Sequence, residues 1–413
     1  MKKINLFIVV LLTLCITSNI YSNGLSLNSI GPRALGMGGA FVGLANDGSA
    51  IYWNPAGLAG QKTSLWLSAT DIIPMASYSF APANIDAKSV INHYFAPNLF
   101  FNYNMGDLSL ALGVSVPAGL GVEYQGKDLT AFTGGVDLNW MSRIGVINFS
   151  PAVAYKVSDN FSLGLAVNIF YGMFDMDRAA VIPMVGAFQY SESSSGLGFG
   201  VTLGALYNVN ENLSLGLSFR TKTNVTMSGT AKNPAFAGMG GPKESDFDRD
   251  VAWPMWIAAG VAYKPTDNLT FTFDAQMSQW SKSEDVFKTK FKNAVWAGAT
   301  SASGDDTFIL GWEDKTQIRL GAEYKVSNDL ALRAGYYNDP APAPDETLSI
   351  LFPSSSNNVV TGGLGYKLNT VCVEFGLEYL IGAERDVNPT TENMPGKHQM
   401  DILAFSLGVG FEL

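Results

Sequence analysis

The chain has few of the residues on which metal sites, disulfide frameworks and basic surfaces depend. It holds only two cysteines and two histidines among 413 residues, too few for a zinc framework or a disulfide scaffold. Charged residues make up 15% of the sequence, against about 25% in an average soluble protein. The net charge of −10 also argues against a nucleic-acid-binding protein, which needs a basic face.

Long apolar runs are missing after the N-terminal region, whereas glycine and aromatic residues are plentiful. No run of about 18 uninterrupted apolar residues is found there, so a membrane-spanning helix is not expected. The sequence contains 43 glycines, and aromatic residues make up 12% of it. Few charges with many glycines and aromatics, and no long apolar run, are typical of a membrane β-barrel.

The first 22 residues have the pattern of a secretory signal peptide. A lysine pair follows the initial methionine, residues 6–16 are apolar, and a polar stretch of small residues ends near Ser22. Such a segment is removed from the mature protein, so the predicted mature chain begins at residue 23. Cys15 would be discarded with it, which leaves Cys372 without a partner for an internal disulfide.

Six segments in the rest of the chain repeat one pattern. Each has a tyrosine near the end of an alternating run, a short turn rich in Asn, Asp, Ser or Gly, and a new alternating run. Because Asn and Asp tolerate the left-handed backbone of tight turns, each segment predicts a β-hairpin. The six tyrosines are Tyr103, Tyr155, Tyr207, Tyr263, Tyr324 and Tyr366.

Counting the strands around these turns gives fourteen. Six turns join twelve strands, one further strand is expected over residues 62–72, and the last over residues 399–413. Tight turns at one end and long loops at the other are the plan of outer-membrane barrels. The predicted fold is therefore all-β, a 14-stranded antiparallel transmembrane β-barrel, with the six tyrosines in an aromatic girdle at its periplasmic end.

Alternation within the strands assigns their two faces. Over residues 195–207, Leu197 and Phe199 share one face, and Gly198 and Gly204 share the other. An apolar face toward lipid and a small or polar face toward the lumen fit a barrel wall. The alternative is a soluble β-sandwich with the apolar face in its core. The number of strands, the signal peptide and the repeated tyrosines favour the barrel.

The segment before the first strand, residues 23–61, is rich in Gly and Ala and shows little alternation. We expect it to form a hatch that fills the lumen, and residues 62–413 to form the barrel. Gly36, Gly38 and Gly39 permit close approach of the backbone within this segment. A nucleotide-binding loop is not indicated, because neither a preceding strand nor a phosphate-binding lysine accompanies these glycines.

Residues 31–60 resemble the N-terminal hatch of the outer-membrane long-chain fatty acid and aromatic hydrocarbon transporter family; they read GPRALGMGGAFVGLANDGSAIYWNPAGLAG. Asn54, Pro55 and Ala56 match the signature triplet of that hatch. Residues 116–124 resemble the family's Pro-x-Gly-Leu segment, which ends in Glu-Tyr. The resemblance spans essentially the whole mature chain, and it implies a fourteen-stranded barrel with a hatch in its lumen.

The resemblance also implies a route for the ligand. A hydrophobic molecule would land among the extracellular loops and move to a pocket inside the barrel. After the hatch rearranges, it would leave sideways through a gap made by an inward kink of the third strand. Proline lacks a ladder donor and glycine weakens pairing, so the kink is expected at Ser115, Pro117, Gly119 and Gly121. The alternative is that Pro117 only ends a strand at a loop.

Three expected extracellular loops are unusually apolar, at residues 179–188, 233–241 and 348–353. Exposed apolar patches usually mark contacts, and methionine offers an adaptable surface. These loops are candidates for ligand capture; alternatively, they pack on one another to cap the barrel. The residues predicted to capture ligand are Val181, Ile182, Met184, Val185, Phe188, Phe236 and Met239.

Alternation also points several charged residues into the lumen. An arginine there can bind a ligand carboxylate. Opposite charges occur together, however, so the simpler interpretation is that they pair with one another or with Arg33 and Asp47 of the hatch. The predicted lumen charges are Arg220, Arg319, Arg333, Glu374 and Glu378.

These patterns give no sign of an enzyme. His93 and His398 are the only histidines, both are expected at the outer rim, and no serine accompanies either in a nucleophile motif. Acidic stretches such as residues 244–250 are interpreted as solvated loop charge rather than as calcium ligands. The sequence therefore predicts no catalytic residue, no metal and no cofactor.

The predicted function is passive uptake of hydrophobic small molecules, such as long-chain fatty acids or aromatic hydrocarbons, across the outer membrane of a Gram-negative-type bacterium. The expected partners are that ligand and the surrounding lipid and lipopolysaccharide, without nucleic acid, and the barrel is expected to be monomeric. The main alternative is a barrel of the same family that serves protein secretion or assembly and has a sealed lumen. An open polar porin fits the long glycine-rich N-terminus less well.

Overall fold

The six tyrosine-containing segments form six tight hairpins at one end of a closed β-barrel. The computed structural model describes residues 24, 26–27, 30–283 and 285–413; the predicted signal peptide, residues 1–22, lies outside them. All six tyrosines are exposed beside these turns, at 42–51% of their surface. Such amphipathic rings suit the boundary between lipid and water.

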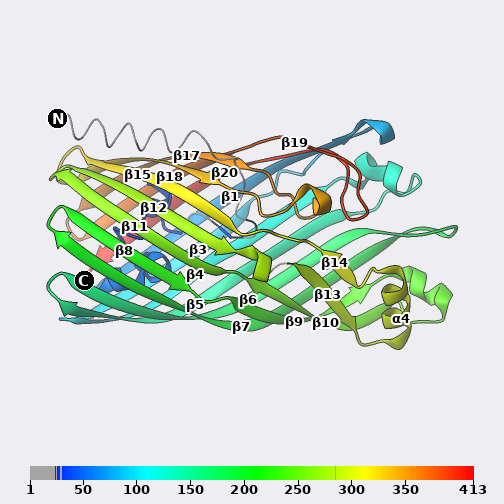
Figure 1. Ribbon diagram of the computed structural model, residues 1–413, viewed down its shortest axis with the longest axis horizontal. Helices are drawn as coiled ribbons and strands as arrows, with labels where there is room; N and C mark the ends of the chain where they lie inside the picture. Colours follow the sequence, from blue (N-terminus) through cyan, green and yellow to red (C-terminus); the bar gives the residue numbers. More distant parts are fainter. Residues whose placement is uncertain (1–23, 25, 28–29, 284) are drawn as a thin grey trace.

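The wall has fourteen antiparallel strands, as predicted (Figure 1). Two of them are interrupted, the seventh between β8 and β9 and the eighth between β10 and β11. Residues 64–79 of the first strand pair with residues 397–412 of the last, which closes the sheet. The wall strands are β1 (Ser64–Phe80), β3 (Tyr94–Met105), β4 (Leu108–Tyr124), β5 (Trp140–Ser158), β6 (Phe161–Ile182), β7 (Gly186–Asn210), β8 (Leu213–Arg220) with β9 (Thr223–Lys232), β10 (Glu244–Trp253) with β11 (Met255–Thr266), β12 (Leu269–Gln279), β15 (Lys315–Lys325), β16 (Leu330–Asp339), β17 (Asn357–Leu368), β18 (Val371–Gly382) and β20 (Gly396–Glu412).

Several strands continue well beyond the length that a membrane requires. β6 has 22 residues and β7 has 25, whereas a tilted strand crosses with about 9–11. The end of the barrel opposite the tyrosines is therefore built up, and it carries the smaller elements of the long loops (Figure 1). These are β2 (Ile85–Lys88), β13 (Val286–Phe291), β14 (Thr307–Ile309), β19 (Arg385–Val387), α4 (Ala294–Ser303) and the 3-10 turns η2 (Ala81–Ala83), η3 (Gly126–Phe132), η4 (Pro234–Met239), η5 (Trp280–Lys282) and η6 (Asp345–Thr347).

Strand extension corrects two sequence expectations. The first strand runs to Phe80 rather than ending at residue 72, and residues 179–188 form the tip of the β6–β7 hairpin rather than a loop. The physical reason is that ladder pairing continues above the membrane level, from Phe161 opposite Tyr207 to Ile182 opposite Gly186. Within the described part of the chain, no helix has the length and apolar character needed to span a membrane.

The described part of the N-terminal segment lies inside the ring of strands (dark blue in Figure 1). Over residues 30–61 it contains α2 (Pro32–Gly36), α3 (Ala50–Trp53) and the 3-10 turn η1 (Pro55–Leu58). α2 contacts β16, β17, β18 and β20, whereas η1 contacts β5, β6 and β7. Residues 30–61, called the hatch below, thus reach across the lumen from one side of the wall to the other.

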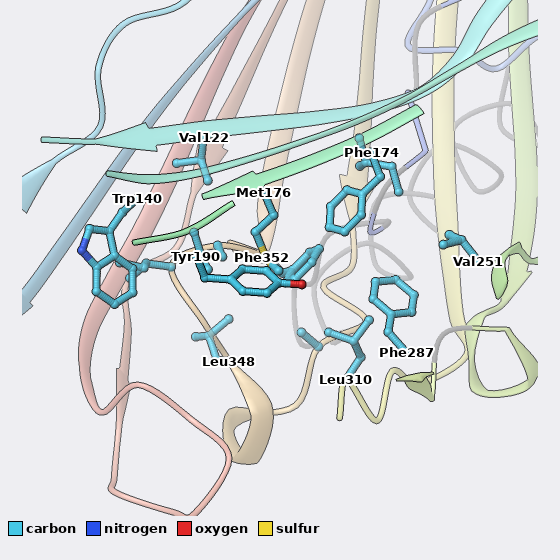
Figure 2. Close-up of a cluster of buried hydrophobic side chains, with 14 of the residues drawn as sticks. Val122, Trp140, Phe174, Met176, Tyr190, Val251, Phe287, Leu310, Leu348 and Phe352 are labelled. Carbon is cyan, nitrogen blue, oxygen red and sulfur yellow. The ribbon is translucent and has the colours of Figure 1, made fainter. Parts of the chain in front are cut away.

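A large apolar cluster fills the lumen at the opposite, built-up end (Figure 2). Leu348 and Phe352 enter it from the connection between β16 and β17, and both are buried. The Phe352 ring lies 6.0 Å from that of Phe174 on β6 and 5.9 Å from that of Phe287 on β13. Residues 348–353, expected as an exposed loop, therefore fold inward, because a run of apolar side chains is stable only where it is covered.

Candidate functional site

Glycines line the inner wall where the hatch touches it. A Cβ atom placed on Gly164, Gly216 or Gly335 would lie 2.3, 2.1 or 2.2 Å from backbone atoms of hatch residues 56, 42 and 38, respectively. These glycines belong to β6, β8 and β16, so the close contact surrounds the hatch. The hatch can sit this near the wall only because these positions carry no side chain.

The Asn-Pro-Ala triplet joins the hatch to the wall. Asn54 is fully buried, and its Nδ2 donates to the carbonyls of Val42 in the hatch (2.9 Å) and of Ala205 in β7 (3.0 Å). Its Oδ1 accepts from the N–H of Ala56 and so begins η1, whose first residue is Pro55. The three residues predicted as a motif thus act together as a clamp between hatch and wall.

The glycines predicted in the hatch also allow the hatch backbone to lie close to the wall. A Cβ atom on Gly36 would lie 2.9 Å from the Cα of Gly363. Gly38 and Gly39 have φ angles of 65° and 63°, a left-handed conformation that favours glycine. The Thr361 hydroxyl in β17 accepts from the Gly38 N–H at 3.0 Å and donates to the Gly36 carbonyl at 3.1 Å.

Charged residues of hatch and wall form one buried network. Arg33 donates to both carboxylate oxygens of Glu323, at 2.8 and 2.9 Å. Arg333 donates to Glu323 at 2.7 Å and also to Glu374. Burial alone lowers the pKa of Arg33, but the Glu323 carboxylate outweighs that effect and raises the pKa. Arg33 thus pairs as the simpler interpretation expects, whereas Asp47 accepts hydrogen bonds from Ser49.

Two further predicted lumen charges lie in the same half of the wall. Glu378 accepts a hydrogen bond from the Tyr337 hydroxyl at 2.8 Å. The Arg319 guanidinium donates to the Gly38 carbonyl of the hatch at 2.8 Å and lies 4.1 Å from the centre of the Tyr337 ring. Arg220 is separate from this group and belongs to the pocket described below.

Removing the Glu323 carboxylate should strongly destabilise the barrel. In Glu323→Ala, Arg33 and Arg333 lose a shared buried anion, and breaking a buried pair costs about 3–5 kcal/mol. The readout is the free energy of unfolding in urea. The fraction of folded barrel is monitored by its mobility in a gel. The control is Glu384→Ala: its pair with Lys397 is half-exposed on both sides, so a change within about 1 kcal/mol is expected. Equal losses in the two variants would contradict a role for burial.

β4, the third wall strand, is paired with β3 over only about half of its length. The ladder between β3 and β4 ends at Leu99 opposite Val114, and residues 94–98 of β3 pair with β1. On the β5 side the register shifts between Ser115 and Ala118, where β4 holds one extra residue, a β-bulge. Pro117 therefore lies within β4 and does not end it at a loop. The same stretch of β4 contains all the predicted kink residues, Ser115, Pro117, Gly119 and Gly121.

The start of the described chain bonds to this stretch of β4. Ser26 and Ala118 form an antiparallel bridge, and the Leu27 N–H donates to the Pro117 carbonyl at 3.0 Å. Because β5 already pairs with the other edge of β4 at Ala118, residues 26–27 lie on the edge that faces β3. Near the end of β4, a second bridge joins Tyr124 to Ser89. We call the interval between the Leu99–Val114 pair and this second bridge the window.

A small pocket lies between the hatch and the window. Tyr52 and Trp53 of the hatch line it, and so do Leu27 and Pro117 from the window. Its free volume is about 30 Å³, which is room for about one water molecule. With residues 26–27 in this position, the pocket is nearly full.

The far side of the pocket is formed where the seventh and eighth strands are interrupted. Arg220 on β8 is opposite Trp256 on β11, and Thr223 on β9 is opposite Trp253 on β10. All four side chains line the pocket. Sequence reasoning singled out Arg220 but missed the other three. The available signal was Pro254, a residue without a ladder donor between two tryptophans of one strand.

The chain matches the family model described as outer membrane protein transport protein (OMPP1/FadL/TodX) over residues 13–411. The chain belongs to this family. It is therefore an outer-membrane transport protein, and members of the OMPP1/FadL/TodX family are transport channels rather than enzymes.

Curated relatives and solved structures agree with this membership. The chain is 24% identical to outer membrane protein P1 of Haemophilus influenzae over 91% of this chain and 93% of that protein. It is 23% identical to the long-chain fatty acid transport protein of Escherichia coli K12, over 90% and 91%. A FadL homologue of Pseudomonas aeruginosa (TM-score 0.78, 17% identity, 94% and 100% covered) and the toluene transporter TodX of Pseudomonas putida (0.74, 18%, 95% and 100%) share its fold.

The loop residues predicted to capture ligand differ in exposure. Val181, Ile182, Met184, Val185 and Phe188 belong to the β6–β7 tip, where Met184 is fully exposed. Phe236 and Met239 belong to η4. Phe236 is buried and stacks on Trp296 with 3.9 Å between ring centres. Its side chain is therefore not exposed to an incoming ligand. The β6–β7 tip stays a predicted capture surface of this OMPP1/FadL/TodX family member.

The remaining polar candidates are the two histidines and Cys372. In the part of the chain that the structure describes, no group of three or more His, Cys, Asp or Glu could hold a metal ion. His93 is exposed beside Asp71. His398, expected at the outer rim, lies near the start of β20 opposite Tyr78 and is buried, with Nε2 2.7 Å from the Met394 carbonyl. Cys372 is half-buried, and its Sγ lies 3.2 Å from Glu374.

Proposed function

We propose that this transport protein takes up hydrophobic small molecules through the lumen pocket and releases them sideways at the window in β4. One observation carries the proposal: Leu27 and Pro117 both line the pocket, and they hydrogen-bond to each other at the edge of β4 that is not paired with β3. A molecule in the pocket therefore already lies against the weakest part of the wall. Relatives named for long-chain fatty acid and for toluene transport support a hydrophobic cargo.

The release step would involve only a small part of the N-terminal segment. Residues 32–58 are held by the wall glycines, the Asn54 clamp and the Arg33 network, whereas the link of residues 26–27 to β4 rests on one bridge and its neighbouring hydrogen bond. A hydrogen bond contributes only about 0.5–1.5 kcal/mol net. We propose that residues 26–27 move first. This movement would enlarge the pocket and, at the same time, expose the edge of β4.

The surroundings of the barrel are part of the proposal. The exposed tyrosine ring and the apolar outer face suit a single barrel in outer-membrane lipid, with lipopolysaccharide around its built-up end. Ligand capture is assigned to the β6–β7 tip, where Val181, Met184 and Val185 are exposed. Passage is driven by the ligand gradient and needs no cofactor.

A reversible tether tests the route. Ser26 and Ala118 are bridge partners, and such pairs have Cα atoms about 4.5–5.5 Å apart, within the range that a disulfide spans. In Ser26→Cys/Ala118→Cys, oxidation should abolish saturable uptake of a radiolabelled fatty acid or monoaromatic by cells. A reductant should restore that uptake to the level of the untreated variant.

Each single-cysteine variant serves as the control and should respond to neither treatment. Full uptake by the oxidised double variant, with the disulfide shown by mass spectrometry, would refute sideways release at the window. Absence of uptake in every state, together with a co-purifying protein, would favour the secretion or assembly role instead.

A further inference from the structure

One aromatic side chain lies across the window between β3 and β4. We infer that Tyr94 determines which molecules leave through the window, because its ring limits the width of the opening and so selects the cargo by its cross-section. This inference rests on the proposed function, since it names a specificity-determining residue for the same exit.

Tyr94 reaches from one edge of the window to the other. It is the first residue of β3 and pairs with Ile72 of β1, on the stretch of β3 that forms no ladder with β4. A Cβ atom on Gly121 of β4 would lie 2.3, 2.4 and 2.6 Å from Cζ, Oη and Cε1 of Tyr94. The ring can lie this close to β4 only because Gly121 has no side chain. In this part of the window, the Tyr94 side chain takes the place of a ladder between the two strands.

The ring covers the outer face of β4. Gly121 is opposite Arg143 in the β4–β5 ladder, and residues opposite each other in a ladder point to the same face. The Arg143 side chain is 59% exposed and pairs with Asp175 at 2.9 Å, so this face is the outside of the barrel. A molecule that moves from the lumen past Gly121 toward the lipid therefore meets the Tyr94 ring.

The window is also closed on either side of Tyr94, but by contacts of other kinds. On one side, the Leu27 side chain lies 4.0 Å from the place of a Cβ atom on Gly119, and the proposed release step removes this contact. On the other side, the Val90 N–H donates to the Glu123 carbonyl at 2.7 Å, which is a main-chain contact. Tyr94 can change rotamer without breaking any backbone ladder. Once Leu27 has moved, the width of the opening therefore depends on Tyr94.

The position of the ring favours slim molecules. The ring occupies part of the gap between the strands, and rotation moves it aside only as far as its neighbours allow. A linear chain or a single aromatic ring needs less of that gap than a branched chain or fused rings. Steric fit to an apolar group discriminates between molecules by about 10–200-fold for one methylene. We therefore expect the wild-type barrel to release slim hydrophobic molecules faster than bulky ones of the same class.

The test compares two molecules of one class that differ in cross-section. The pairs are hexadecanoate with phytanate, its tetramethyl-branched analogue, and toluene with phenanthrene. The pair used is the one whose slim member wild-type cells take up. In Tyr94→Ala, the initial uptake rate of the bulky member relative to the slim member should rise about tenfold. Uptake by cells without the barrel is subtracted, and the ratio of the two rates does not depend on the amount of folded barrel.

Further substitutions in β3 check that the ring itself is responsible. Tyr94→Phe keeps the ring and should leave the ratio unchanged, whereas Tyr94→Trp has a larger ring and should lower it. Phe95→Ala is the matched control. Phe95 is the next residue of β3, its side chain is 70% exposed, and it is not among the nearest neighbours of a Cβ atom on Gly121. This variant should keep the wild-type ratio.

Equilibrium binding separates the exit from the pocket. Tyr94 does not line the lumen pocket, so Tyr94→Ala should leave the dissociation constants of both molecules for the purified barrel unchanged. These constants are measured by equilibrium dialysis with radiolabelled ligand. The inference would be overturned by an unchanged ratio of uptake rates in Tyr94→Ala, by equal acceleration of both molecules, or by a change in binding that accounts for the new ratio.

The same experiment distinguishes this inference from the proposed function. If wild-type cells take up a slim molecule but Tyr94→Ala keeps the wild-type ratio, Tyr94 does not control the exit, while hydrophobic uptake stands. If wild-type cells take up neither slim molecule, the proposed function fails and this inference fails with it. A raised ratio in Tyr94→Ala, with wild-type ratios in Tyr94→Phe and Phe95→Ala, supports both.

Discussion

Replacing Gly164 with valine is expected to displace the hatch from the wall and to destabilise the barrel. The first atom of the new side chain would lie 2.3 Å from the Ala56 nitrogen and from the Pro55 carbonyl carbon. Both are backbone atoms of η1, which cannot retreat without breaking the hydrogen bond that joins Asn54 to Ala205. Overpacking of a well-filled site costs about 1–3 kcal/mol or more, and here the simplest relief is displacement of the hatch.

The measurement is the free energy of unfolding of the purified barrel in urea. Gly164→Val should lower this free energy by about 1–3 kcal/mol or more, the cost of overpacking a well-filled site. Gly145→Val on the neighbouring strand β5 is the control, since a Cβ atom there meets nothing within 4 Å. Wild-type stability of the Gly164→Val barrel would mean that the contact between β6 and the hatch accommodates the new side chain without loss.

The strand plan could be predicted because it depends on local patterns. A tyrosine, a turn residue such as Asn160 or Asn212, and alternation mark every tight hairpin. The glycines of the hatch and Pro117 are likewise visible as residues whose backbone behaviour is unusual. Each of these features says something about one short segment, and that is the range over which a single sequence is informative.

Contacts between distant segments were not predictable in the same way. Alternation placed Arg333 and Glu374 on the inner face, but nothing in their spacing reveals that Glu323 bonds Arg33, which is 290 residues away. Nor does an apolar run such as residues 348–353 show whether it covers a ligand or the protein's own lumen. The pocket was missed for the same reason, because Thr223 and Trp253 meet only through the register of β9 and β10.

Deleting Pro117 is expected to close the window and stop uptake. The bulge gives β4 one more residue than β5 between Ser115 and Ala118, so removing one residue restores a regular ladder on that side. The straightened strand can then continue its pairing with β3 beyond the Leu99–Val114 pair. Each regained ladder bond contributes about 0.5–1.5 kcal/mol, so several of them together should lower the initial rate of uptake by at least about tenfold. The rate is measured with radiolabelled fatty acid in cells that hold equal amounts of folded barrel.

Pro117→Ala separates the effect of the bulge from that of the proline. This variant keeps the number of residues in β4 and adds only one N–H, so the two-against-one mismatch with β5 remains and most of the uptake should be retained. If the deletion and Pro117→Ala reduced uptake equally, the missing donor rather than the extra residue would keep the window open. If the deletion left uptake unchanged, the ligand would have to leave along the barrel axis, past a hatch that the wall glycines hold on every side.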